Sequence, residues 1–480
     1  MIKSIQQLPS RYEPLVKTLG ESAQTTFVEQ AQDLAALRTL FAQLKSANQG
    51  KWMFLYHPSQ SGAGKTTFIH SLGVFLPEAV GEVKRLPTPS SLKPADIPRF
   101  LDAIPLSSRA TVVNFDQHES LYYSEDEYRS LLVQINAVLR NRSDLLILWP
   151  VNDLVFGERL VGLQRTIGGH SAFGASPIYR MAGLSSAQYG TVLERILKVA
   201  NWALEDAALD WGEIASITSG AENIGGYLDR VQATIAARFD VGRLGFSPPK
   251  LVFVLSSGKR EVRDVCRNLR RADSYYLEAS RLLMYTKRSN VAEWWQERNT
   301  VLTTGLPYVV ALFDAQLLAI SGSSVVHAVL NFGPDDLAAL GQSVQRNLGN
   351  AKKVIASTEL HEFSLGQAVD SREYGLVAQE ETLEAYARIQ ELSKTKHRAI
   401  NAAVMRLVAE AGGGFSNVQL EQAAGVAQGL VIDVTAERDG VEHAIEFHHK
   451  ADRETDSNPV AIYALTKLKE YAINYGLAGP

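Results

Sequence analysis

The sequence contains almost no cysteine. Cys266 is the only one among 480 residues, so no disulfide can form within a single chain, and we do not expect a cysteine-based zinc site. Cys266 lies in "EVRDVCRNLRR", where packing into a core is the expected role.

Long apolar runs are also missing. The first fifteen residues, "MIKSIQQLPSRYEPL", lack the apolar core of a signal peptide. The richest apolar stretch, "LPYVVALFDAQLLAISG", contains Asp314 and Gln316 and is too short and too polar to span a bilayer. We therefore expect a soluble cytoplasmic protein that makes no membrane contact.

The chain has no strong excess of charge of either sign. Its formal net charge is -4, so any surface for nucleic acid must be a local patch. Apolar residues make up 46% and charged residues 21%, which is typical of globular proteins. The length predicts two or three domains.

The segment "KWMFLYHPSQSGAGKTTFIHSLGVFL" has the order of a phosphate-binding loop. A short apolar run predicts a buried strand, a glycine-containing turn follows, and helical spacing then resumes. The residues predicted to bind the nucleotide are Ser59, Gln60, Ser61, Gly62, Ala63, Gly64, Lys65, Thr66 and Thr67.

Each residue type in this loop has a chemical reason to be there. Gly62 and Gly64 allow the backbone N–H groups to turn toward phosphate oxygens, above the positive end of the helix dipole. Lys65 is expected to reach the β- and γ-phosphates, and the Thr66 hydroxyl to bind Mg²⁺. Ser59 replaces the usual first glycine, which requires only a negative φ.

Two further predicted strands end in polar residues. Asp116 follows "TVVNF" and is expected to hold Mg²⁺ through water, although it could instead cap a helix. Gln117 stands where a catalytic glutamate is usual, so either Glu119 substitutes or hydrolysis is slow. Asn152 follows "LLILWPV", where it would sense the γ-phosphate.

The ordered segments "SQSGAGKT", "VVNFD", "LLILWPVN" and "KLVFVLSS" resemble the AAA+ and STAND-like division of P-loop NTPases. The resemblance implies an α/β fold with a parallel sheet flanked by helices, and ATP with Mg²⁺. It also implies assembly into a homo-oligomer. One of three arginines could act as an arginine finger, either across a subunit boundary or within the same chain, while the others would be surface residues. The three arginines are Arg159, Arg165 and Arg180.

The middle of the chain is less informative. A predicted helix after residue 257 has an apolar stripe and many basic residues, which suit either a phosphate backbone or a solvated helix face. These basic residues are Lys259, Arg260, Arg263, Arg267, Arg270 and Arg271. Apolar runs at 307–320 and 324–332 predict strands or short buried helices.

The C-terminal region predicts a helix, a hairpin and a second helix. The strands "LVIDVTAE" and "EHAIEFHHK" contain Asp433 and Glu446 and flank the turn "RDG". This arrangement resembles restriction-endonuclease-like nucleases of the PD-(D/E)xK type. The resemblance implies that Asp433 and Glu446 bind Mg²⁺ and that Glu410 could add a carboxylate.

The C-terminal region also departs from that family. His448 occupies the place of the motif lysine, Lys450 shares its strand face, and the family usually adds another strand after the second helix. Three possibilities therefore stay open: an active nuclease, an inactive nuclease-like module, and an unrelated α/β module.

We accordingly predict an N-terminal extension (1–30), a P-loop NTPase domain (31–285), a mostly helical middle region (286–375) and a small C-terminal α/β module (376–480). The predicted function is an ATPase acting on double-stranded DNA with partner proteins, in a bacterial restriction or anti-phage system. The alternatives are a DNA-binding regulator or loader without nuclease activity, and a protein-triggered signalling scaffold.

Overall fold

The structure is a computed structural model, and it shows two compact units. It describes residues 8–9, 11–59, 62–89, 91–118, 123–169, 171–200, 202–258, 261–367, 379–425, 429–451 and 454–479. The first unit comprises residues 1–203 and 210–234, and the second comprises 204–209 and 235–480. The predicted boundaries at 285 and 375 do not coincide with this division.

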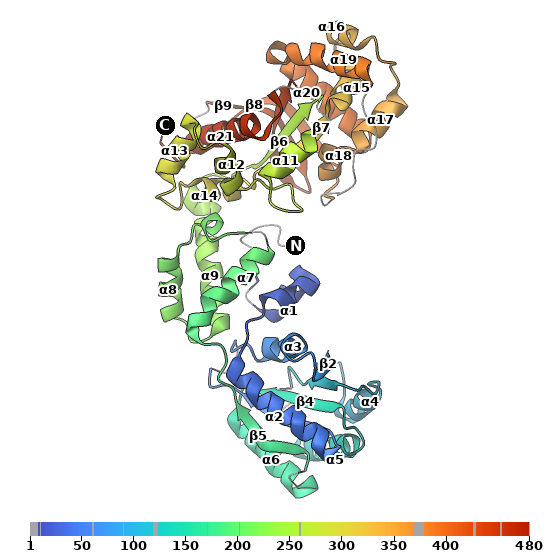
Figure 1. Cartoon of the computed structure of the whole chain (residues 1–480), viewed down its shortest axis with the longest axis vertical. Coiled ribbons are helices and arrows are strands. Elements are labelled where there is room, and N and C mark those ends of the chain that lie inside the picture. The colour runs from blue at the N-terminus through green and yellow to red at the C-terminus, as the bar shows by residue number, and fades with distance from the viewer. Residues whose placement is uncertain are drawn as a thin grey trace. The chain divides into compact units, whose positions relative to one another are not determined.

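The first unit is built on a parallel five-stranded sheet. Its strand order is β2-β3-β4-β1-β5, so the strand before the glycine loop lies between β4 and β5. Figure 1 shows this sheet, with β2, β4 and β5 labelled. The strands are β1 (Lys51–Tyr56), β2 (Val80–Arg85), β3 (Ala110–Asn114), β4 (Leu145–Val151) and β5 (Phe173–Arg180). Polar residues that follow β3 and β4 therefore meet at the same edge as the glycine loop.

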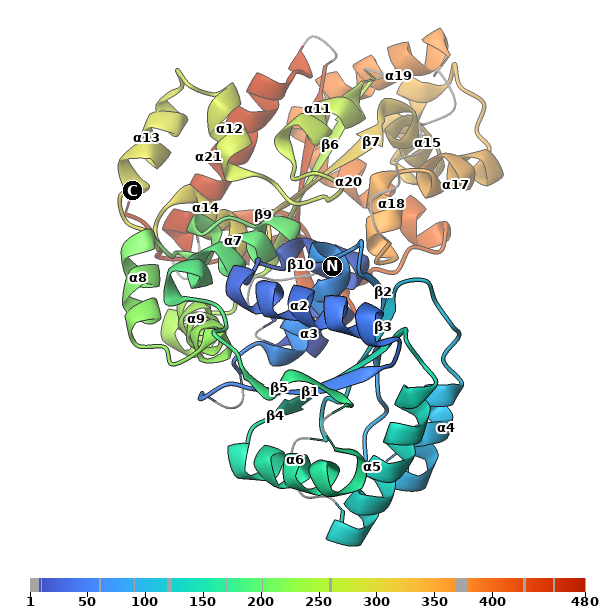
Figure 2. The same cartoon turned by 60° about the horizontal axis from the view of Figure 1, so that its bottom comes forward.

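Helices cover both faces of this sheet because the side chains of β1 alternate. Trp52 and Phe54 pack with α4, α5 and α6, whereas Met53 and Leu55 pack with α2 and α3 on the opposite face (Figure 2). The helices are α1 (Tyr12–Leu19), α2 (Ala31–Ala47), α3 (Lys65–Phe75), α4 (Ile97–Asp102), α5 (Glu125–Arg140) and α6 (Leu154–Gly168). The predicted α/β class, a parallel sheet flanked by helices, is confirmed.

Three helices follow the sheet of the first unit. They are α7 (Tyr189–Val199), α8 (Trp211–Ser219) and α9 (Ile224–Arg238). Short 3-10 turns lie at Gly20–Thr26, Pro94–Asp96, Ser186–Gln188, Glu205–Ala207 and Ala339–Gly341.

The second unit contains a mixed five-stranded sheet of order β7-β6-β10-β9-β8. Its strands are β6 (Lys250–Ser257), β7 (Gln316–Ser321), β8 (Ser416–Ala424), β9 (Leu430–Arg438) and β10 (Val441–Lys450). β6 pairs in parallel with both β7 and β10, as in the register Phe253 to Glu446. The prediction that β6 is the fourth strand of the nucleotide-binding sheet is therefore wrong, because its hydrogen-bonding partners lie in the C-terminal half of the chain.

The predicted C-terminal hairpin is confirmed. β9 and β10 are antiparallel, and the pair Arg438 and Val441 closes the turn. Its two central residues, Asp439 and Gly440, have φ of 53° and 74°, as a two-residue hairpin turn requires. β8, which the sequence reasoning missed, pairs with β9 on the other side.

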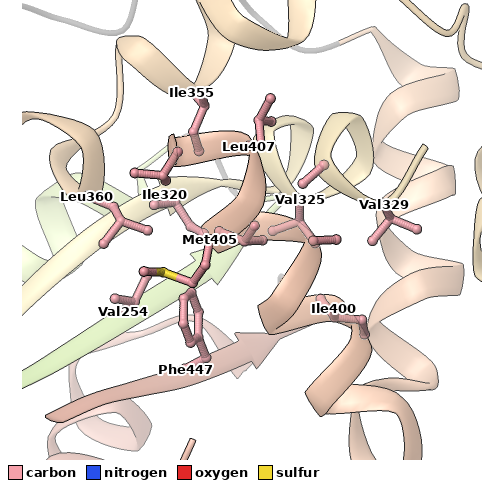
Figure 3. Close-up of a cluster of buried hydrophobic side chains, with 14 of the residues drawn as sticks. Val254, Ile320, Val325, Val329, Ile355, Leu360, Ile400, Met405, Leu407 and Phe447 are labelled. Carbon is pink, nitrogen blue, oxygen red and sulfur yellow. The ribbon is translucent and has the colours of Figure 1, made fainter. Parts of the chain in front are cut away.

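Helices surround the second sheet. They are α10 (Val241–Leu244), α11 (Val262–Leu269), α12 (Ala279–Tyr285), α13 (Asn290–Arg298), α14 (Leu306–Leu312), α15 (Gly322–Phe332), α16 (Asp335–Ala338), α17 (Leu348–Ala356), α18 (Glu359–Ser364), α19 (Glu380–Glu391), α20 (Ser393–Glu410) and α21 (Ser457–Asn474). Val254 and Phe447 of the sheet pack with Val325 of α15 and Met405 of α20 in one apolar core (Figure 3). No helix in the described ranges combines the length and apolar character needed to cross a bilayer.

Candidate functional site

The glycine loop joins β1 to α3. Gly62 and Gly64 have φ of 85° and 84°, in the left-handed region that favours glycine, and Gly64 caps the helix that begins at Lys65. Ser59, at the place of the usual first glycine, donates from its hydroxyl to Nδ1 of His57 at 2.7 Å. The predicted residues Gln60 and Ser61 lie outside the described residues.

Lys65 and Asn152 meet at the end of the sheet. The Lys65 ammonium is buried and donates a hydrogen bond of 2.7 Å to Oδ1 of Asn152, just after β4. Because β4 is the neighbour of β1, this polar side chain lies directly beside the loop. The structure thus brings together two residues that lie 87 positions apart.

Asp116 lies on the other side of the same site. Its carboxylate is buried and forms an ion pair of 2.7 Å with Arg85, at the end of β2. Arg85 also pairs with Glu13 at 3.3 Å. Gln117 adopts a left-handed backbone with φ of 66°, and Glu119 lies outside the described residues.

One cavity of about 250 Å³ contains these groups. The polar part of its lining, here called its polar end, comes from Gly62–Thr67, Asp116 and Asn152. The apolar part comes from Phe27, Val28, Leu184, Val192, Ile196, Ile224 and Leu228. The polar residues suit a phosphate chain and the apolar residues a nucleobase. The first unit has a P-loop NTPase-like fold.

The donor set at the polar end suits Mg²⁺. The hydroxyl of Thr66 and the carboxylate of Asp116 are hard oxygen ligands that line the same cavity. Mg²⁺ usually takes only one or two protein ligands and keeps waters and phosphate oxygens as the others. A cluster of three ligating side chains is not required, and none occurs among the described residues.

A buried carboxylate holds the apolar wall of the cavity in place. Asp33 of α2 accepts hydrogen bonds of 2.9 Å from the Tyr179 hydroxyl and from the backbone N–H groups of Ala182 and Gly183. Its side chain is fully buried. These bonds fix the segment that leads from β5 to Leu184. Asp33 was not identified in the sequence, where an aspartate in the first turn of a helix is a common stabilising residue.

The three candidate arginine fingers are not among the described residues that line the cavity. Arg159 forms an ion pair with Glu125, and Arg165 and Arg180 are exposed. Arg11 is the arginine that lines the cavity, and the sequence reasoning did not select it.

The basic helix after β6 does not form a basic face. Glu359 accepts hydrogen bonds from Arg263 at 2.9 Å and from Arg270 at 3.0 Å, and all three side chains are buried. Arg271 is buried against Asp206 at 2.7 Å. Arg267 is exposed, while Lys259 and Arg260 lie outside the described residues. Both alternatives, a face that binds a phosphate backbone and a solvated helix face, are therefore wrong for the three buried arginines, because they form internal ion pairs.

Asp433 and Glu446 lie on neighbouring strands of the second sheet. The N–H of Phe447 donates to Asp433 at 2.9 Å. The fully buried Glu446 accepts from the Tyr471 hydroxyl at 2.8 Å and lies 3.3 Å from the Lys467 ammonium. Burial raises the pKa of Glu446 to about 7, with the Asp433 charge adding to the shift and Lys467 opposing it. Burial also raises the pKa of Asp433.

The residues predicted to act together with Asp433 and Glu446 contact other side chains instead. The His448 ring stacks on Tyr463 at 3.6 Å between centroids, and burial lowers its pKa to about 3. Lys450 pairs with Glu454 at 3.3 Å, and Glu410 pairs with Lys352 at 3.0 Å.

Lys467 is the cation beside Glu446, and the sequence reasoning missed it. Its position on α21, four residues from both Tyr463 and Tyr471, was the available signal, because residues at this spacing share one helix face.

No protein-family model matches the chain, and no curated protein is significantly similar to it. A solved structure of a DNA replication initiation factor matches over 80% of this chain and 95% of that one, at 12% sequence identity and a TM-score of 0.28. A TM-score this low supports no conclusion about fold or function. Both rest on the geometry of this chain.

Proposed function

We propose that the first unit binds ATP with Mg²⁺ and hydrolyses it slowly. The observation that supports this most is the gathering of Lys65, Asp116 and Asn152 around one cavity that is also lined by apolar side chains. The Lys65 ammonium and the loop N–H groups would offset phosphate charge. Asn152 would orient the terminal phosphate, and Mg²⁺ held by Thr66 and Asp116 would neutralise charge on the leaving phosphate.

Slow turnover is proposed because of Gln117. An amide at this position accepts no proton at neutral pH, so it orients water without acting as a base. The proposed role is therefore that of a switch, in which the bound nucleotide orders the surrounding loops.

Nucleotide binding is tested by titrating the full chain with MgATP and measuring heat. Lys65→Ala should weaken binding at least about tenfold, since a charge-assisted contact to phosphate is lost. Lys45→Ala, which changes an exposed lysine in the last turn of α2, is the matched control. Equal affinities of Lys65→Ala and the unaltered chain would overturn the proposal.

We further propose that the second unit contacts double-stranded DNA without cutting it. A nuclease-like module is supported by the paired strands that carry Asp433 and Glu446, which lie between α20 and α21 in the chain. The additional strand expected of such a module is supplied by β6, which lies parallel to β10. Glu446 is fully buried and interacts with Lys467 and Tyr471, and these contacts would have to be exchanged for Mg²⁺ before the carboxylate could support cleavage.

The DNA proposal is tested with supercoiled plasmid, MgATP and a salt titration of binding. We expect intact plasmid, affinity that falls with salt because phosphate contacts release counterions, and ATP turnover stimulated by DNA. Cleavage that disappears in Glu446→Gln would instead establish a nuclease. An absence of DNA affinity at low salt would favour a protein-triggered scaffold. Assembly into a homo-oligomer and a role in restriction or anti-phage defence stay predictions from the sequence.

A further inference from the structure

The segment that begins helix α1 lies against the nucleotide cavity. Arg11, Tyr12 and Glu13 all line it, and the Tyr12 ring stacks on His70 of α3 at 4.7 Å between centroids. This segment is held at both ends by ion pairs. Arg11 pairs with Asp229 of α9 at 2.6 Å, and Glu13 pairs with Arg85, which also pairs with Asp116.

The Arg11 guanidinium lies between two glycines, one of the loop and one of α9. A Cβ atom on Gly62 would lie 2.9 Å from Nη1 of Arg11, and one on Gly225 would collide with the same atom. The N–H of Gly225 donates to the carbonyl of Gly62 at 2.9 Å, so the loop and α9 are in direct contact. Side chains at either position would exclude the guanidinium.

The surroundings of Arg11 contain charges of both signs. The positive charge is that of Lys65, which lines the same cavity as the glycine loop and the N-terminal end of α9. The negative groups are Asp229, which pairs with Arg11, and Glu13 and Asp116, which both pair with Arg85. Asp229 engages Nη2, whereas Nη1 is directed at Gly62 and Gly225. A guanidinium has five N–H donors that point outward in its plane, and Asp229 engages Nη2, so other N–H groups can donate to an anion in the cavity.

We propose that Arg11 binds the terminal phosphate of the nucleotide from within the same chain. The inference rests on the proposed nucleotide binding by the first unit. A phosphate bound in a bidentate manner by Arg11 would join the loop, α1 and α9 through one charged network. A nucleoside triphosphate would engage this network, and a diphosphate would engage it less.

The test compares the affinities of full-length variants for MgATP and MgADP by calorimetry. Arg11→Ala should weaken MgATP binding at least about tenfold and MgADP binding less than about threefold. Compared with Arg11→Ala, Arg11→Lys should restore part of the preference for MgATP over MgADP, because lysine keeps the charge but lacks the planar set of donors. Arg38→Ala, which alters an exposed arginine on α2, should change neither affinity.

Asp229→Asn separates phosphate binding from a structural tether. It removes the ion pair to α9 but keeps the guanidinium, so the preference for MgATP should persist. The inference is overturned if Arg11→Ala weakens the binding of both nucleotides equally or changes neither affinity. It is also overturned if Asp229→Asn loses the preference for MgATP as Arg11→Ala does. If the unaltered chain binds neither nucleotide, the proposed function fails too. If only the Arg11 inference fails, binding that depends on Lys65 remains.

Discussion

The Lys65 ammonium donates to Oδ1 of Asn152 across 2.7 Å, and this bond joins the first residue of α3 to the end of β4. The lysine proposed to bind phosphate and the amide proposed to orient it are therefore in direct contact. Phosphate oxygens compete for the same ammonium, so a change at Lys65 is transmitted directly to Asn152.

Replacement of Asn152 should separate nucleotide binding from turnover. In Asn152→Ala we expect MgATP affinity within about threefold of the unaltered chain and turnover reduced at least about tenfold, because the amide acts mainly on the terminal phosphate. Phosphate release measured at saturating MgATP tests this. Asn141→Ala, at the end of α5, is the control. Unchanged turnover would contradict the assignment.

Removal of the Asp33 carboxylate should destabilise the first unit. Asp33→Ala leaves the Tyr179 hydroxyl and two backbone N–H groups, all partly buried, without their acceptor, at a cost of about 1–3 kcal/mol in the free energy of unfolding. Urea denaturation followed by tryptophan fluorescence measures it. Asp102→Ala, at an exposed site in α4, should change the same quantity by less than about 0.5 kcal/mol. Equal effects would count against the role of Asp33.

Glu446 should make the second unit less stable as pH rises. Its folded pKa of about 7 exceeds the ordinary value of 4.5, so between these values the folded state keeps a proton that the unfolded state releases. This contribution is complete below pH 4.5 and is lost as pH rises through 7.

Glu446→Gln removes the titrating group. Relative to the unaltered chain, we expect it to gain at least about 1 kcal/mol of unfolding free energy between pH 5 and pH 8. Denaturant titrations at several pH values test this, with the exposed Glu391→Gln as the control. A difference that stays constant with pH would show that Glu446 is ionised throughout.

Cys266 should report unfolding of the second unit. Its thiol is fully buried, and burial raises its pKa to about 12. We expect a disulfide exchange reagent at pH 8 to react at least about a hundredfold more slowly in native buffer than in denaturant. One thiol per chain should be released on unfolding. Rapid native reaction would mean that α11 opens readily.

Local patterns predicted the centre of the first unit well. The glycine loop, β3 and β4 each carry their own signal in a few consecutive residues. β2 and β5 were missed because edge strands of a sheet expose more of their side chains, and β2 contains Glu82 and Lys84 within its six residues.

Contacts between distant segments were much harder to predict. The apolar run of β6 suits either sheet equally, and only its pairing with β10 assigns it to the second unit. Arg11 and Lys467 carry no motif, and they become recognisable only once the fold places them beside Gly62 and Glu446. Buried arginines such as Arg270 looked like surface charge because Glu359, their partner, lies far along the chain.

The pairing of β6 with β10 has a consequence during synthesis. The ribosome makes β6 and β7 long before residues 441–450. One edge of the apolar strand β6 therefore lacks its native neighbour while nearly two hundred further residues are added. The first unit is complete at residue 234, and its longest delay is shorter, since β1 pairs with β5, which begins at residue 173. Chains interrupted before β10 would expose a strand edge suited to pairing with another copy, so a chaperone that covers β6 would benefit the second unit far more than the first.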